Sequence, residues 1–101
     1  MASRKQREVL AKKNVEASVL YRILTERKNV DQVKSLLGAY GLDYTLFYGD
    51  GAWQCVPEDS MAIELANLPR ALAESVSRAI KRLNGQEAIL LQEIPLRNIF
   101  L

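Results

Sequence analysis

The fold is decided by residues 44–65, which read YTLFYGDGAWQCVPEDSMAIEL. Apolar residues alternate with others at both ends of this stretch, and such alternation predicts two half-buried strands, at 42–48 and 61–66. Between them we predict a polar loop, residues 49–60, which holds the only Trp and the only Cys of the chain. A loop of this length with a large aromatic side chain near its middle tends to carry function.

A helix is predicted immediately upstream, because an apolar stripe at helical spacing runs through residues 30–40. Asn29 followed by Gln32 resembles a capping box at its start, and Gly41 is placed to end it.

The segment before this helix has two interpretations. Residues 16–25 alternate and are rich in β-branched and aromatic side chains, so we favour a strand. Apolar residues spaced four apart also allow one long helix over residues 3–27, and this alternative stays open.

A second helix is predicted after the stretch at 44–65. Asn67 is expected to cap it, Pro69 to lie in its first turn and Gly85 to end it. Its expected buried stripe consists of Leu72, Val76, Ala79, Ile80 and Leu83.

The chain is predicted to end in strands. One is expected at 87–93, Pro95 is expected to break it, and residues 96–101 are expected to add a short fifth strand. The complete order, β-α-β-β-α-β, predicts an α+β fold, the ferredoxin-like plait, with two helices on one face of an antiparallel sheet. If the long N-terminal helix replaced the first strand, the sheet would have three strands.

Composition bounds the class of protein. The chain has 101 residues, 49% of them hydrophobic and 26% charged, which suits one ordinary globular domain. Residues 1–28 carry eight Lys/Arg against three Glu, and the remainder carries six against nine acids. We therefore expect a basic N-terminal arm over 1–14 and a single α+β domain over 15–101.

Features that the sequence lacks limit the expected cellular location and chemistry of the protein. There is no secretory signal and no long apolar run, so we expect a cytoplasmic protein without a membrane partner. The chain has no His, which removes the commonest general base and metal ligand. We expect no cofactor, no metal and no catalytic residue; Ser60 lacks a base to activate it, and Cys55 is expected to be a small buried thiol.

Apolar residues on both faces of the predicted strands indicate that both faces of the sheet are covered. Leu20 and Leu24 lie beside Val19 and Ile23, although the helices cover one face alone. We therefore expect a homo-oligomer, a dimer or larger. Its predicted interface consists of Leu20, Leu24, Ile99, Phe100 and Leu101.

The pattern Gly49-x-Gly51-x-Trp53, followed by Pro57-Glu58-x-Ser60, resembles small, mostly uncharacterised proteins of tailed phages and prophages. The resemblance covers residues 16–94 in element order. It implies a ferredoxin-like fold and a phage setting, hence the host cytoplasm, and it transfers no catalytic residue.

The leading functional hypothesis is a non-enzymatic oligomeric binding protein of phage type. It would bind a small nucleotide-like ligand or block a host defence protein. The predicted contact residues are Trp53, Gln54, Glu58, Ser60, Arg22 and Arg97, with the two arginines as candidates for a phosphate. Gly49 and Gly51 are expected to permit positive φ in a tight turn, without forming a phosphate loop.

Two alternatives remain from other classes. The first is a single-stranded nucleic-acid-binding protein that uses the basic N-terminal region, with tyrosines or Phe47 stacking bases on the open face of the sheet. The second is a small enzyme of the dimeric plait type.

Overall fold

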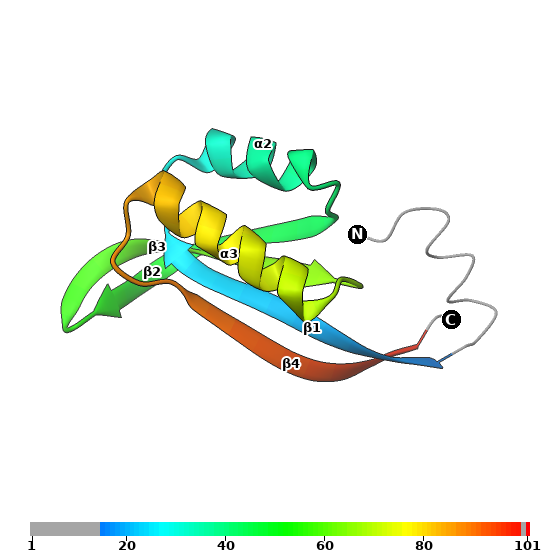
Figure 1. The fold of residues 1–101 in the computed structure, drawn as a ribbon. Coiled ribbons are helices and arrows are strands. Elements are labelled where there is room, and N and C mark those ends of the chain that lie inside the picture. The colour runs from blue at the N-terminus through cyan, green and yellow to red at the C-terminus, as the bar shows by residue number, and fades with distance from the viewer. Residues whose placement is uncertain (1–14, 100) are drawn as a thin grey trace.

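The computed structural model describes residues 15–99 and 101 of the chain. It contains four strands and two helices: β1 (Val15–Glu26), α2 (Val30–Ala39), β2 (Tyr44–Trp53), β3 (Val56–Ala66), α3 (Arg70–Asn84) and β4 (Leu90–Ile99). The strands form one antiparallel sheet in the order β2-β3-β1-β4, and both helices lie on the same face of it (Figure 1). This is the predicted ferredoxin-like plait.

The register divides the side chains of the sheet between two faces. Ile23 is paired with Ile63 of β3 and with Leu91 of β4, and these three point toward the helices. Their neighbours along the strands point to the opposite face, because side chains alternate along a strand. We call this second surface the open face.

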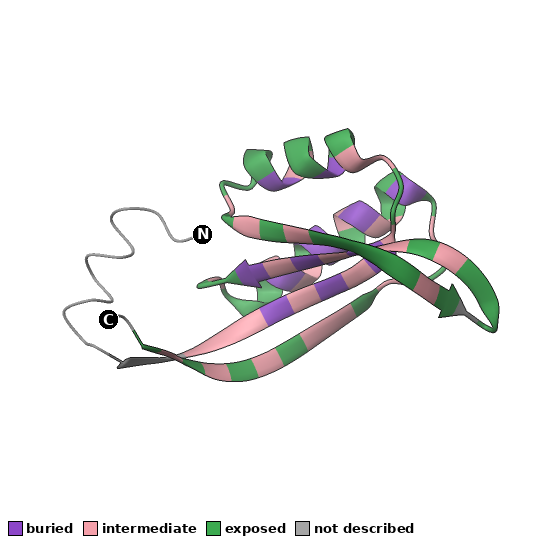
Figure 2. Ribbon diagram, turned by 180° about the vertical axis from the view of Figure 1, so that it is seen from behind, coloured by how far each residue is buried: buried purple, intermediate pink, exposed green. Residues whose placement is uncertain are grey.

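The core lies between the sheet and the helices, as the purple bands in Figure 2 show. Its fully buried side chains come from β1, β3 and both helices. They include Ile23, Val33, Leu37, Met61, Ile63, Leu65, Val76 and Ile80. Tyr44 and Leu46 of β2 pack partly buried against this cluster. The core thus fixes which face of each strand remains free.

The predicted loop at 49–60 is wrong, because these residues continue the two strands. β2 and β3 pair from Tyr44 with Leu65 to Trp53 with Val56, which leaves a two-residue turn at Gln54 and Cys55. Both turn residues have positive φ, 49° and 65°, as a type I′ turn requires. The expected positive φ at Gly49 and Gly51 does not occur.

The break at Pro95 and the fifth strand are also wrong. β4 is continuous from Leu90 to Ile99, and Pro95 is opposite Val19 of β1. Since β4 is an edge strand, a residue without an N–H group fits wherever its nitrogen points away from β1. The predicted start at residue 87 moves to Leu90.

The helix ends confirm the predicted glycines and correct the predicted caps. Gly41 and Gly85 have positive φ and follow the ends of α2 and α3, respectively. At the end of α2, the amides of Gly41 and Leu42 donate hydrogen bonds to the carbonyls of Gly38 and Leu37. Asn29 makes no side-chain cap on α2 and instead bonds to the end of α3. Pro69, rather than Asn67, is the N-cap of α3.

The buried stripe of α3 is shifted from the predicted one. Val76 and Ile80 are buried as predicted, but Leu83 is 37% exposed and Asn84 is 1% exposed. The helix turns Ala73, Ser77 and Asn84 toward the sheet. The buried face of α3 is therefore rotated from Leu83 toward Ala73, Ser77 and Asn84, because packing against α2 and the sheet sets the rotation of the helix.

The start of the described chain decides between the two N-terminal interpretations. β1 is a strand, paired with β3 on one side and with β4 on the other, so the long helix over 3–27 and the three-stranded sheet are excluded. The predicted arm at 1–14 lies outside the described residues. Neither described helix is long and apolar enough to cross a membrane.

Candidate functional site

A cavity of about 510 Å³ lies at the end of the sheet where the β2–β3 hairpin extends beyond β1. Three segments line it: the last residues of β1, the hairpin, and the connection from α3 to β4. Its lining residues are Leu24, Thr25, Glu26, Gly51, Ala52, Glu58, Ser60, Gln86, Glu87, Ala88, Ile89 and Leu90. This volume falls within the range of small-molecule sites.

The hairpin wall is shaped by a close contact between its two strands. Gly51 is paired with Glu58, and a Cβ atom at Gly51 would lie 3.1 Å from the Ser60 Oγ. The Ser60 hydroxyl donates a hydrogen bond to the Gly49 carbonyl at 3.1 Å. Glycine at position 51 therefore lets the Ser60 side chain lie along the hairpin beside the cavity.

The opposite wall is held by a cluster of amide and hydroxyl side chains. The buried Asn84 donates to the Gln86 Oε1 at 3.3 Å and accepts from the Asn29 Nδ2 at 3.1 Å. The Thr25 hydroxyl also donates to the Gln86 Oε1. Lys28 donates to the Asn84 carbonyl at 2.9 Å. These bonds tie the connection after α3 to β1 and to the start of α2, so this wall has a defined position.

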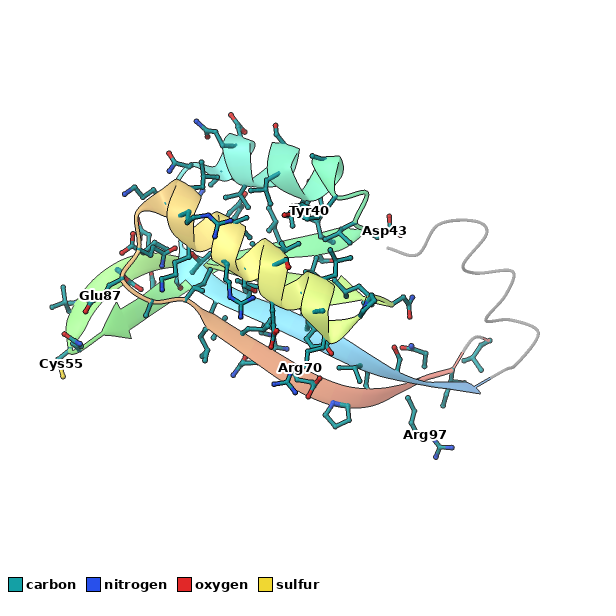
Figure 3. All side chains as sticks on the ribbon, viewed as in Figure 1. Tyr40, Asp43, Cys55, Arg70, Glu87 and Arg97 are labelled. Atoms are coloured by element: carbon teal, nitrogen blue, oxygen red, sulfur yellow. The ribbon has the colours of Figure 1, made fainter. Side chains whose placement is uncertain are left out.

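The charged groups in the lining of the cavity are all acidic. Glu26, Glu58 and Glu87 contribute carboxylates, Thr25, Ser60 and Gln86 contribute neutral polar groups, and no Lys or Arg of the described chain lines the cavity. Figure 3 shows Glu87 on the connection after α3, at the same end of the molecule as the hairpin tip with Cys55. Cys55 is exposed, which corrects the expected buried thiol.

The predicted contact residues do not lie together in the structure. Glu58 and Ser60 line the cavity, and Gln54 lies in the hairpin turn. The backbone of Trp53 ends β2, but its side chain lies outside what the structure describes. The structure thus brings Glu58 and Ser60 together with residues that the sequence did not single out.

The two arginines that we considered for a phosphate lie away from the cavity lining. Arg22 binds the Glu64 Oε2 through its Nε at 3.0 Å and its Nη2 at 2.8 Å on the open face. Arg97 is paired with Ala17, eight positions along β1 from Thr25, or about 26 Å at the usual rise of a strand. Figure 3 shows it at the opposite end of the molecule from Glu87.

Sequence reasoning missed Thr25, Glu26, Gln86 and Glu87. No local pattern marks the first two, because β1 ends there as an ordinary strand. Gln86 and Glu87 follow the glycine that ends α3, and this short polar run was the one available signal.

The predicted interface residues are also placed by the register. Leu20 and Leu24 lie half-buried on the open face, beside Ile94 and Leu90 of β4. Ile99 and Leu101 are exposed at the end of the chain, and Phe100 lies outside the described residues.

The aromatic residues of the strands are divided between the faces. Tyr21 and Tyr44 point toward the helices, and Tyr48 lies under the guanidinium of Arg27, 4.0 Å from the ring centroid. Phe47, 51% exposed, is the aromatic side chain that the described part of the open face carries. The tyrosines are therefore not arranged to stack bases on that face.

No protein-family model and no curated protein matches this sequence. Solved structures, in contrast, match most of the chain. It is similar to CPII from Thiomonas intermedia K12, a nitrogen regulatory PII-like protein bound to ADP, AMP and bicarbonate. That match has a TM-score of 0.64 and 13% identity, over 86% of this chain and 98% of that chain.

Two further structures show the same arrangement. A DUF3240 family protein from Shewanella baltica OS155 matches with a TM-score of 0.64 and 15% identity, over 83% of this chain and 96% of that chain. A phage SAM lyase in complex with S-methyl-5′-thioadenosine matches with a TM-score of 0.56 and 13% identity, over 82% and 90%. At these identities the similarity shows the fold alone, which is that of small PII-like and ferredoxin-like proteins.

Proposed function

We propose that this protein is a non-enzymatic, oligomeric binding protein whose cavity takes a small nucleoside-type ligand. The observation that carries the proposal is the cavity of about 510 Å³ between the hairpin and the connection after α3, because its walls combine apolar surface with convergent polar groups. Proteins of the same fold support the ligand class, since CPII is bound to ADP and AMP and the phage SAM lyase to S-methyl-5′-thioadenosine.

A binding role without catalysis is favoured by the chemistry of the lining. The chain has no His, and the Ser60 hydroxyl is engaged with the Gly49 carbonyl. A serine with no His to activate it is a weak nucleophile. The carboxylates of Glu26, Glu58 and Glu87 are groups that orient a polar ligand by accepting hydrogen bonds.

The oligomer is the second part of the proposal, with the open face as the surface between subunits. Two apolar pairs lie there, Leu20 with Ile94 and Leu24 with Leu90, on either side of Arg22 and Gln92, and Leu90 is 49% exposed. Exposed apolar surface on a sheet face that no helix covers favours association with another chain.

The resemblance of residues 49–60 to tailed-phage proteins supports a phage setting, in the host cytoplasm. Binding a nucleotide-like signal, or blocking a host defence protein, would serve a phage there.

The ligand proposal is tested by filling the cavity. Isothermal titration calorimetry with adenosine, AMP, ADP and S-methyl-5′-thioadenosine should show saturable binding of at least one of them. Ala88→Trp should abolish this binding, because Ala88 is an exposed residue of the cavity wall. Ala71→Trp is the matched control, since Ala71 is exposed on α3 and does not line the cavity.

Two results would overturn the proposal. The first is that none of the four compounds binds at millimolar concentration. The second is that both tryptophan variants bind as the wild type does, which would place the ligand elsewhere.

A further inference from the structure

We infer that the cavity selects a nucleoside bearing a cationic substituent over one bearing a phosphate. This inference rests on the proposed function, because it concerns the ligand of the same cavity. It starts from the sign of the charges on the cavity walls, which is negative on both sides.

The hairpin and the end of β1 supply two of the carboxylates. Glu26 is paired with Ser60, and Glu58 lies two residues before Ser60 on the same face of β3. Such diagonal positions are about 7–8 Å apart in an antiparallel pair. Glu26 and Glu58 therefore flank one small region of the open face.

The third carboxylate comes from the other wall. Glu87 follows Gln86, whose side chain is fixed by Thr25 and Asn84. A ligand that fills the cavity thus lies between acids on two separate segments of the chain.

The basic residues nearest in sequence to this end of β1 make contacts outside the cavity. The guanidinium of Arg27 stacks on Tyr48, and the Lys28 ammonium donates to the Asn84 carbonyl. Arg22 is paired with Glu64. None of the three lines the cavity, so the described chain offers no cation to neutralise a phosphate there.

The consequence is a difference in affinity set by charge. A phosphate in the cavity would lose water and face carboxylates, whereas an ammonium group would gain their attraction. Discrimination by such repulsion is a common source of specificity.

A charge series on one scaffold tests the inference. We would titrate the full-length protein with 5′-amino-5′-deoxyadenosine, adenosine and AMP at low ionic strength. The dissociation constant should rise in that order, by about tenfold or more between the amine and AMP. Added salt should reduce the difference, because screening weakens charge interactions.

Two glutamate variants locate the effect. Glu58→Gln and Glu87→Gln should each weaken binding of the amine, relative to adenosine, and improve binding of AMP. Asp43→Asn is the matched control, since it removes one exposed carboxylate that does not line the cavity.

The outcomes separate this inference from the proposed function. If AMP binds as tightly as the amine or more tightly, the charge inference is wrong while a nucleoside-binding cavity stands. If adenosine and the amine bind equally, it is also wrong. If none of the three compounds binds, the nucleoside-binding proposal fails, and the inference fails with it.

Discussion

At the scale of single residues, Tyr21 shows how one polar contact is built into an apolar core. The residue is 4% exposed, and its hydroxyl donates a hydrogen bond to the Glu93 Oε1 at 2.7 Å. This hydrogen bond, together with burial, raises the pKa of Tyr21 above its ordinary value. The folded state therefore holds the phenolic proton more tightly than the unfolded chain does.

The sign of this shift predicts a loss of stability at alkaline pH. A raised pKa in the folded state stabilises the protein below the unfolded value of about 10, and this contribution is lost as the pH rises above it. We expect Tyr21→Phe to have a lower Tm than the wild type at pH 8. The difference in Tm between the two proteins should become smaller toward pH 11. Thermal melts followed by circular dichroism measure this difference in Tm. A difference that stays constant with pH would show that the hydroxyl does not titrate as described.

At the scale of elements, the β2–β3 hairpin is the feature that most affects the site. Its polar half, residues 49–60, adds a second wall to a surface that the sheet alone would leave flat. The turn places Gln54 and Cys55 at positive φ, a conformation that Asn and Gly adopt with less strain. The tip is therefore a strained point in an otherwise regular ladder.

This strain gives a stabilising prediction. The double substitution Gln54→Asn with Cys55→Gly should raise the free energy of unfolding by about 1 kcal/mol. Urea denaturation measures the change. Asn67→Gly is the control, because Asn67 also has positive φ. Asparagine tolerates this conformation, so the increase in the free energy of unfolding should be smaller. An unchanged midpoint for the double variant would mean that the turn is not of this type.

At the scale of the whole molecule, one face of the sheet is covered by helices and the other is not. Both helices pack on one face of the sheet (Figure 2). The open face carries Leu20, Leu24, Leu90 and Ile94, with the Arg22–Glu64 ion pair among them. A second copy placed there would remove this apolar surface from water.

The oligomer is tested by mass in solution. Light scattering after size exclusion should give a multiple of the chain mass of 11.4 kDa. Leu20→Glu should return the protein to a single chain, because a charge at this position would oppose burial of the open face. Leu83→Glu, on an exposed position of α3, is the control that should keep the assembled mass.

Circular dichroism distinguishes loss of assembly from loss of folding in these variants. A wild-type protein that is monomeric at all concentrations would contradict the proposed interface.

Much of the fold could be predicted from local patterns. The alternation at 16–25 and 61–66 identified strands, and the stripes before Gly41 and Gly85 identified helices that end at these glycines. Of the predicted contact residues, Glu58 and Ser60 line the candidate site. The remainder of the site depends on segments that are distant in the sequence, namely Glu26 at the end of β1 and Gln86 after α3.

Local patterns predict the type and order of the elements from α2 to β4, because apolar periodicity and glycine at helix ends act within a few residues; the choice of a strand for β1 came from its pairing with β3 and β4. Tertiary structure alone decided the extent of β2, β3 and β4, the rotation of α3 and the existence of the cavity. Residues 49–60 carry little apolar signal, yet pairing between the two strands satisfies their backbone groups and extends the hairpin. Glu58 and Glu87 are distant in the sequence. They line one cavity because both segments lie beside the end of β1 in the folded sheet.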